Sequence, residues 1–511
     1  MSYTDRVKNS GRNAAYGLLS QFVALTMNFV VRTVFIRYFD VAYLGINGLF
    51  TNVLTILSLA ELGFGTAMIH YMYKPLALGD VPGMQALLKY YRKVYRYIGL
   101  VVLTLGLGII PFLDYFVGET PQIDGILYIY LLYLFNSVSS YFYSYSRTVF
   151  DADQKSYINA RYRYYFVIIK SFTQIIALVI YADFLLFLLI QILMTVAENV
   201  FVSLLARRKY SAFFVENDKR LGRDKIQRIN RDVRALMLSR VAHVALNGTD
   251  NIIISSFIGL GAVGLLSNYT MLTGTLVMIL STVTRAATGS IGNYLAVERS
   301  ENRHQLFRKV DFITFWLYAF CTVCFVTLAN PFINAWLGPA YELEWVVVLV
   351  IGLNFLIDGM LNSFWIFRST LGLFTQGRYR PLIAALLNIF FSLLLVKYLG
   401  LLGVLLGTTI SKSLVNIWYD PYLIHKHGLF TPLRGYARIS LFRLTLTASM
   451  VVGIRLALSL FPVQAYNFLS FTLLALAVAT FTAGVFLLVY RKTSEFQYFL
   501  SLLAKLVRRR A

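Results

Sequence analysis

Long apolar runs recur from one end of the chain to the other, and they constrain its fold more than any other feature of the sequence. A helix needs about 20 predominantly apolar residues to span a bilayer, or roughly 17 to 25 when it tilts. By this criterion the 511 residues contain about 14 spans. The predicted spans lie near residues 14–37, 43–68, 95–117, 125–149, 162–181, 184–206, 235–258, 263–295, 311–332, 343–367, 381–399, 401–421, 441–461 and 466–490. The sequence therefore predicts an all-α, polytopic membrane protein.

The composition agrees with this fold class. Hydrophobic residues make up 58% of the chain and charged residues 14%, and the mean hydropathy is +0.65. A soluble domain is nearer half apolar and about a quarter charged. The polar N-terminal residues lead directly into the first apolar run, so we expect no cleavable signal peptide.

The net charge of +23 would suggest a nucleic-acid partner in a soluble protein. Here the Lys and Arg residues concentrate in alternate loops between the spans, and no basic surface domain is predicted that would bind DNA or RNA. The opposite loops, such as residues 114–125 and 338–344, are short and acidic. Under the positive-inside rule, an even number of spans then places both termini in the cytoplasm.

The most basic loop lies near residues 207–235 and forms the natural internal boundary. Six predicted spans precede it and eight follow it. The order of features around Asn47, in the second span, recurs around Asn268, in the eighth, and such a repeat would mean two transporter halves. We expect an N-lobe of residues 1–210, a basic cytoplasmic linker of 211–234, a C-lobe of 235–424, two further spans within 425–490 and a basic amphipathic cytoplasmic tail of 491–511.

Two stretches outside the spans have apolar residues at helical spacing with cations opposite. Residues 80–97 carry one such stripe, and the C-terminal tail carries another that includes Phe496 and Phe499. Amphipathic helices of this kind bind the anionic inner leaflet. We expect both stretches to lie on the membrane surface.

Five basic residues inside predicted spans are the candidate substrate-binding residues: Arg32, Lys170, Arg240, Arg285 and Lys412. A charge at membrane depth is costly unless it faces a partner or water. One interpretation is that each side chain reaches an interface or pairs with a local acid. The other is that several of them line one water-filled cavity. Because Arg and Lys hold phosphate oxygens well, such a cationic cavity would suit an anionic substrate.

The acids considered inside predicted spans are fewer: Glu61, Glu198, Asp250 and Asp358. They either neutralise neighbouring cations or bind the H⁺ or Na⁺ that drives transport, and the sequence leaves both interpretations open. Glu61, Asp250 and Asp358 are the candidate ion-coupling residues. Asp250 and Asp358 are the better of the three because they lie deeper in their spans.

Several short motifs carry no function in this context. Residues 259–264 spell GxGxxG, but they lie at a turn between two spans and lack the strand-turn-helix setting of a nucleotide site. No P-loop pattern is present. Cys321 and Cys324 form a CxxC inside an apolar run, where two small buried residues are the expected reading. We therefore expect no metal site, no catalytic residues and no enzyme activity.

Other motifs resemble a known family. They are YLGINGLF at residues 43–50, LAELG at 59–63, YKPL at 73–76, DADQK at 151–155, NGTDNI at 247–252 and LSNY at 266–269. Together they resemble the polysaccharide repeat-unit flippases, the Wzx-type branch of the multidrug/oligosaccharidyl-lipid/polysaccharide exporter superfamily. Beyond residue 300 the resemblance lies in the pattern of spans.

The resemblance implies a MATE-like fold, with two six-helix lobes in a V and two extra C-terminal helices. It implies a flippase that moves an undecaprenyl-diphosphate-linked oligosaccharide across the bacterial cytoplasmic membrane for capsule, O-antigen or exopolysaccharide synthesis. The substrate headgroup would occupy a cationic central cavity, with alternating access, a coupling ion and no other cofactor. Membrane lipids, a polysaccharide polymerase and glycosyltransferases are the implied partners.

Three alternatives remain open at this stage. The first is a flippase for another lipid-linked precursor, of peptidoglycan or teichoic acid. The second is a drug/cation antiporter, which would favour an acidic or aromatic cavity and is disfavoured by the excess of intramembrane cations. The third is a membrane enzyme such as a polysaccharide polymerase, which usually carries a large outside loop, whereas the outside loops predicted here are short.

Overall fold

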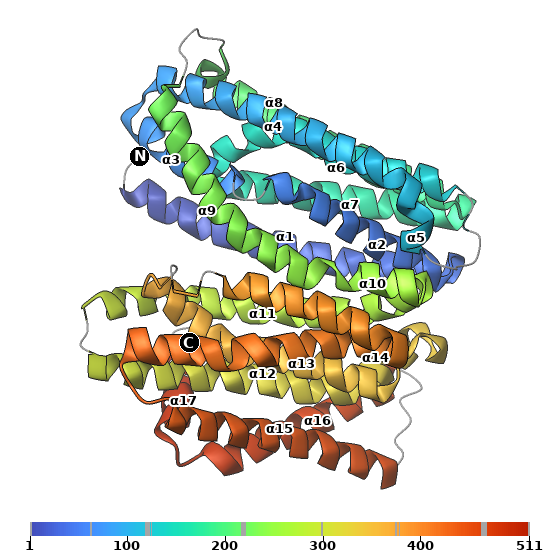
Figure 1. Cartoon of the computed structure of the whole chain (residues 1–511), viewed down its shortest axis with the longest axis vertical. Coiled ribbons are helices and arrows are strands. Elements are labelled where there is room, and N and C mark those ends of the chain that lie inside the picture. Colours follow the sequence, from blue (N-terminus) through green and yellow to red (C-terminus); the bar gives the residue numbers. More distant parts are fainter. Residues whose placement is uncertain are drawn as a thin grey trace. The chain divides into compact units, whose positions relative to one another are not determined.

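The computed structural model describes residues 3–61, 64–117, 123, 125–215, 221–297, 300–373, 376–377, 379–460 and 468–508. Across these residues helix is the only regular secondary structure, so the all-α prediction is confirmed. Contacts divide the chain into two compact units, Met1–Val263 and Gly264–Ala511. Figure 1 colours both units along the sequence. The expected lobe boundary at residues 211–234 stays a prediction.

The first unit is built from long helices joined by short connections. Its elements are α1 (Tyr3–Tyr38), α2 (Val41–Leu57), η1 (Ser58–Glu61), α3 (Phe64–Leu78), α4 (Val81–Ile109), η2 (Ile110–Phe112), α5 (Leu113–Val117), α6 (Ile126–Ala152), α7 (Ser156–Tyr181), α8 (Phe184–Lys209), η3 (Ser211–Phe214), α9 (Arg223–Gly248) and α10 (Asp250–Phe257). Its core joins α2, α3, α4 and α6 through residues such as Phe50, Met68, Tyr91 and Tyr130, all fully buried.

The second unit continues from α11, whose first residues still belong to the first unit. Its elements are α11 (Leu260–Val297), α12 (Ser300–Leu337), η4 (Pro339–Tyr341), α13 (Trp345–Thr370), α14 (Arg380–Ile424), the π-helical turn η5 (His425–Leu429), α15 (Arg434–Leu460), α16 (Phe468–Tyr490) and α17 (Ser494–Arg508). α12 is central to this unit, because it contacts α13, α15, α16 and α17.

Eleven helices in the described part of the chain are long and apolar enough to cross a membrane. Three features account for the difference from the 14 predicted spans. α14 covers two predicted spans, the span 43–68 is divided among α2, η1 and α3, and the span 235–258 is divided between α9 and α10. Each of the 14 predicted spans therefore overlaps helical structure.

The two spans within α14 are separate helices that fold back on each other at Gly400. This glycine has a φ of 54° and a ψ of −132°, a left-handed conformation that side-chain-bearing residues rarely adopt. The Asn388 side chain then donates to Thr408 Oγ1 at 2.8 Å, and Ser392 Oγ donates to the carbonyl of Val404 at 3.2 Å. These bonds hold the two helices on either side of Gly400 as an antiparallel pair, as the prediction of spans at 381–399 and 401–421 requires.

The expectation that residues 80–97 lie on the membrane surface is wrong. Asp80 caps α4 by accepting from the backbone N–H of Gly83 at 2.9 Å, and the helix then runs without interruption into the predicted third span. The apolar stripe faces the core of the first unit, where Met84, Leu87 and Tyr91 are fully buried. Packing against protein buries the stripe, so no lipid surface is needed for it.

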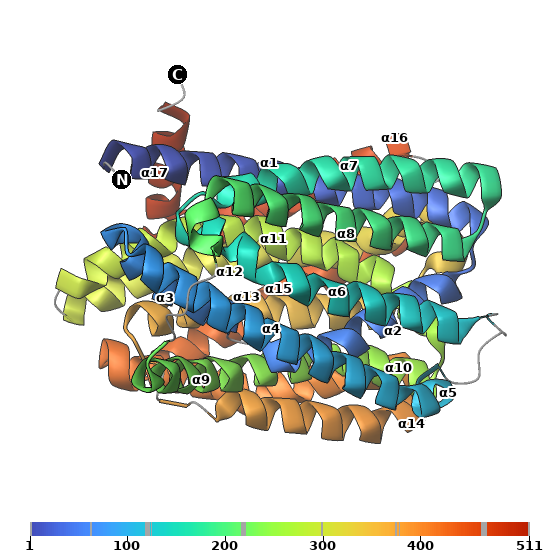
Figure 2. The same cartoon turned by 90° about the horizontal axis from the view of Figure 1, so that it is seen from above.

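The C-terminal helix α17 also begins against protein. The Phe496 ring packs on Phe312, and Phe499 packs on Trp316, with ring centroids 6.2 and 5.0 Å apart. Figure 2 shows α17 turned crosswise to the long helices of its unit, at their ends. The first part of the predicted surface stripe therefore docks α17 on α12.

Candidate functional site

Two predicted spans of the first unit are interrupted, and each interruption carries a candidate coupling acid. Helix α2 ends in the 3-10 turn η1, whose last residue is Glu61. Helix α9 ends at Gly248, and α10 begins at Asp250. Interrupted helices are where transporters commonly place substrate and ion sites, because the ends of the half-helices carry partial charges. Both acids therefore lie at helix interruptions, the positions where a transporter can bind an ion or a charged substrate.

The two interrupted spans pack against each other. Helix α2 contacts α9 and α10, and α3 contacts α9; Figures 1 and 2 both show α2 beside α10. The start of α11, just after α10, also approaches α2, because a Cβ atom at Gly45 would lie 2.0 Å from the carbonyl oxygen of Leu260. Gly48 lies next, beside Val263 and the side-chain amide of Asn251. Small residues permit this close backbone packing in a membrane.

Tyrosine hydroxyls supply hydrogen bonds to the polar groups of α2 and η1. Tyr95, which is 2% exposed, donates to Glu61 Oε1 at 3.3 Å. Tyr133 donates to Asn47 Oδ1 at 3.0 Å, and Thr51 donates to the same atom at 3.4 Å. Asn47 belongs to the YLGINGLF motif, so this motif has both a packing role, through its glycines, and a polar role.

A second polar group in the first unit joins α6, α7 and α8. Arg147 donates to Glu198 Oε1 at 2.9 Å and to Asn199 Oδ1 at 2.5 Å. The same carboxylate interacts electrostatically with the candidate Lys170, as does the cation Arg163. Arg147 also interacts electrostatically with the carboxylate of Asp151. The three cations Arg147, Lys170 and Arg163 therefore exceed the two acids, and the group keeps a net positive charge. An anionic ligand is the partner that such a group favours.

Arg32 lies in α1, on the helix that packs beside Lys170. Asn13 and the start of α7 fix the register, because the backbone N–H of Tyr157 donates to Asn13 Oδ1 at 2.8 Å. From that level the two helices run in parallel, and Arg32 and Lys170 differ in height by six residues. At 1.5 Å per residue this is about 9 Å along the axis. The two candidates thus lie in adjacent helices at neighbouring depths.

In the second unit the structure brings two candidates into one ion pair. Lys412 Nζ lies 2.8 Å from Asp358 Oδ1 and 2.9 Å from Oδ2, joining α14 to α13. The Lys412 side chain is 15% exposed and that of Asp358 56% exposed, so the carboxylate is the more open partner. One turn away, Thr409 donates to Asn354 Oδ1 at 3.2 Å. Pairing of a span cation with a span acid is the first of the two interpretations that the sequence left open.

The remaining candidates are only partly placed. The backbones of Arg240 and Arg285 belong to α9 and α11, but their side chains lie outside the described residues. Arg32, Lys170 and Arg240 belong to the first unit, and Arg285 and Lys412 to the second. That several of these residues line a single cavity stays a prediction.

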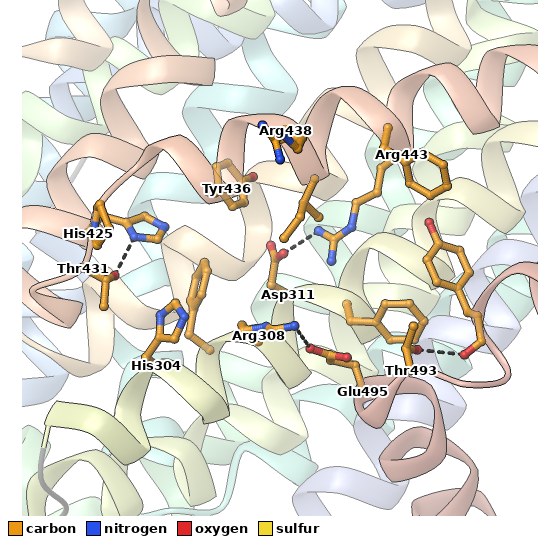
Figure 3. Close-up of a pocket in the computed structure, with 17 residues that line it drawn as sticks. His304, Arg308, Asp311, His425, Thr431, Tyr436, Arg438, Arg443, Thr493 and Glu495 are labelled. Atoms are coloured by element: carbon orange, nitrogen blue, oxygen red, sulfur yellow. Dashed lines mark hydrogen bonds and ion pairs between the residues drawn. The ribbon is translucent and has the colours of Figure 1, made fainter.

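The most deeply buried ion pair among the described residues was not predicted from the sequence. Arg443 Nη1 lies 2.5 Å from Asp311 Oδ2, and their side chains are only 7% and 5% exposed (Figure 3). Ser363 Oγ donates to the other carboxylate oxygen at 2.7 Å. The sequence indicated that both residues would need partners, because each is a charged residue within the bounds of a predicted span. Arg147, in the last turns of α6, likewise falls within a predicted span and was not among the candidates.

The comparisons with known proteins agree with this architecture. Residues 10–288 match the family described as polysaccharide biosynthesis protein, which is more than half of the chain. The chain belongs to the polysaccharide biosynthesis protein family. Its expected membership is thereby confirmed, and the match covers the first unit with its interrupted spans and ionic group. No curated protein matches the chain by sequence.

Solved structures show which fold this family member has. The structure of lipid II flippase MurJ in an inward closed conformation is similar with a TM-score of 0.64 and 13% identity, covering 92% of this chain and 98% of that chain. An inward-facing multidrug resistance MATE family transporter of the MOP superfamily has a TM-score of 0.58 at 14% identity, covering 80% and 98%. A Vibrio cholerae MATE transporter has a TM-score of 0.55 at 12% identity, covering 84% and 99%. The protein is therefore a multi-pass membrane protein with the MATE-like fold.

Proposed function

We propose that this protein is a flippase that moves undecaprenyl-diphosphate-linked oligosaccharide repeat units across the bacterial cytoplasmic membrane, for capsule, O-antigen or exopolysaccharide synthesis. The family match over residues 10–288 carries the proposal, because it connects a chain with a transporter fold to the making of polysaccharides. Both termini would lie in the cytoplasm, as the distribution of basic loops predicts. The protein would be a transporter and have no catalytic residues of its own.

The charges inside the spans support a diphosphate-bearing substrate. In the first unit, the three cations Arg147, Lys170 and Arg163 are accompanied by two carboxylates, those of Glu198 and Asp151. A guanidinium and ammonium groups held in a medium of low dielectric constant form strong charge-assisted hydrogen bonds with phosphate oxygens. The polyprenyl chain would remain in the lipid, while the two units alternate in exposing the headgroup to either side.

Ion coupling would involve the acids of the two units. Asp358 is the most suited to this role in the second unit, because its carboxylate is open and holds Lys412. Neutralising Asp358 by a proton or a cation would leave Lys412 free to bind the anionic headgroup. Glu61 and Asp250 are the corresponding candidates at the interruptions of the first unit.

A flippase for a peptidoglycan or teichoic acid precursor is the second candidate. The observation that favours it is the similarity to lipid II flippase MurJ over nearly the whole chain. Lipid-linked precursors of both classes carry a diphosphate or phosphate next to a sugar, so the cationic group does not discriminate between them. A drug/cation antiporter would need the opposite charge in its binding site.

Deletion of the gene in its host tests the proposed function. We expect the surface polysaccharide to be lost while undecaprenyl-linked repeat units accumulate on the cytoplasmic side of the membrane. Loss of viability with accumulated peptidoglycan or teichoic acid precursor would instead establish the second candidate. Normal polymers combined with new sensitivity to cationic drugs would refute both flippase proposals.

Single charge removals test the site in the complemented deletion strain. Lys170→Ala and Lys412→Ala should each lower polysaccharide output by about tenfold or more, since each removes a charge-assisted bond to phosphate. Lys397→Ala is the matched control, because Lys397 is an exposed lysine near the turn at Gly400. Full output from both site variants, at wild-type amounts of membrane-inserted protein, would show that the cationic-site mechanism is wrong.

A further inference from the structure

A cavity of about 670 Å³ lies in the second unit, where several helix ends meet. The start of α12, the π-helical turn η5, the first turns of α15, the end of α16 and the start of α17 supply its walls (Figure 3). Neither Asp358 nor Lys412 belongs to its lining. The cavity is therefore separate from the ion pair described above, and its position at the helix ends corresponds to the headgroup level of a bilayer.

The charged groups of the cavity leave an excess of positive charge. Arg443 pairs with Asp311, and Arg308 lies 2.6 Å from Glu495. Arg438 also lines the cavity, and it forms no ion pair within the described part of the chain. The lining thus contains three arginines and two acids, so one cationic group is left without an acid to balance it.

Three polar atoms at the cavity lack any hydrogen-bond partner among the described residues. They are His425 Nε2, His304 Nδ1 and the hydroxyl of Tyr490. His425 is 3% exposed and Tyr490 is 7% exposed, so bulk water does not provide hydrogen bonds to these side chains. His425 lines the cavity, and its Nδ1 shares a hydrogen bond with Thr431 Oγ1 at 2.8 Å, which fixes the orientation of the ring. Buried polar atoms in native proteins are nearly always satisfied, and an orphaned one at a roomy cavity indicates a bound partner.

The remaining wall is apolar and adjoins the exposed apolar surface of α15. Phe312 and Ile439 line the cavity together with Phe442, which is 50% exposed. The neighbouring Leu441 is 64% exposed and continues the apolar surface away from the cavity. A ligand here would meet cationic and hydrogen-bonding groups at one end and an acyl-compatible surface at the other.

We propose that this cavity binds a phosphate group, presented by the headgroup of an anionic phospholipid, at a site distinct from the transport route. Arg438 would supply the unbalanced charge, and His425 and Tyr490 the buried hydrogen bonds to phosphate oxygens. A phospholipid is favoured over free phosphate because the cationic end leads onto the exposed aromatic and aliphatic side chains of α15. The site would tie α15 and α16 to α12 through a lipid.

Binding to the purified full-length protein tests the proposal without any transport assay. The protein in lipid-free detergent is titrated with dioctanoyl phosphatidylglycerol, with dioctanoylglycerol, which lacks the phosphate, and with inorganic phosphate, using microscale thermophoresis. We expect phosphatidylglycerol to bind and dioctanoylglycerol not to bind. Equal binding of inorganic phosphate would keep the phosphate site and assign free phosphate as its source. Equal binding of dioctanoylglycerol, or no binding of either phosphate compound, would overturn the proposal.

Three variants connect the binding to this cavity. Arg438→Gln and Tyr490→Phe should each raise the Kd for phosphatidylglycerol by about tenfold. Tyr490→Phe removes a hydroxyl with no partner in the described structure, so the fold should be retained. Arg434→Gln is the matched control, because Arg434 is an exposed arginine one turn earlier on α15 that does not line the cavity. A Kd unchanged in Tyr490→Phe, or raised equally in Arg434→Gln, would place the lipid elsewhere.

Discussion

Gly45 provides the sharpest test of how α2 packs against the start of α11. It lies in the second turn of α2, where a Cβ atom would be 2.0 Å from the carbonyl oxygen and 2.7 Å from the carbonyl carbon of Leu260. Real Cβ atoms essentially never approach a heavy atom closer than 3.0 Å. The Gly45→Ala substitution therefore requires α2 and the start of α11 to separate by about 1 Å. The obstructing atoms belong to the backbone, so no side-chain rotation relieves the clash.

Two opposing effects determine how much stability the Gly45→Ala substitution removes. Overpacking a well-packed interior costs about 1–3 kcal/mol, and a backbone obstruction belongs at the upper end of this range. Replacing glycine by alanine inside a helix returns about 1 kcal/mol through propensity. The net loss is about 2 kcal/mol of unfolding free energy. At about 2–4 °C per kcal/mol for a unit of this size, the melting temperature should fall by about 4–8 °C.

The assay is the thermal unfolding of the purified full-length protein in detergent, followed by the loss of the monodisperse size-exclusion peak. Gly48→Ala is the control, because its closest contact is the Val263 side chain at 3.0 Å, which can move. We expect this variant to melt within about 2 °C of the wild type, since the helix propensity gain offsets a small clash. A Gly45→Ala protein that melts with or above the wild type, or a Gly48→Ala protein that falls as far, would refute the reasoning.

Two further perturbations follow from buried polar contacts and use the same melting assay. Asp311→Asn leaves the Arg443 charge buried and unbalanced, which should cost about 3–5 kcal/mol, whereas the double variant Asp311→Leu/Arg443→Met should lose much less. Burial and the carboxylate of Asp153 raise the pKa of Tyr210 above its ordinary value of 10.0, and Tyr210 donates to Asp153 at 2.5 Å. The folded state therefore keeps this proton above pH 10, where the unfolded state loses it, so stability falls as the pH rises further and Tyr210→Phe should flatten that fall.

The predicted span positions were correct because hydrophobic length is a local property of the sequence. Every predicted span overlaps a helix, and the turn between the spans 381–399 and 401–421 lies at Gly400, the residue that the left-handed conformation requires. The interruptions after Leu57 and at Thr249 were not predicted. A hydropathy average over about 20 residues does not register a few residues that leave the helix.

The partners of the charged residues could not be predicted, since pairing depends on which helices become neighbours. Lys412 and Asp358 are 54 positions apart, and Arg443 and Asp311 are 132 apart. No local spacing relates such residues, although their presence inside predicted spans marked them as needing partners. The apolar stripe at Met84 was misassigned for the same reason: an amphipathic helix packs on protein or lipid with the same residue pattern.

The two units differ in how readily their described cations would bind an anion. In the first unit, Arg147, Lys170 and Arg163 outnumber the carboxylates of Glu198 and Asp151, so the group keeps a net positive charge that attracts a phosphate. In the second unit, Lys412 is held by Asp358, and a phosphate must displace a carboxylate that is bound at 2.8 Å. Under the proposed function, the first group would bind the headgroup directly, and the second would bind it only when Asp358 is neutralised. A coupling ion would then control headgroup binding in the second unit and leave headgroup binding in the first unit unchanged.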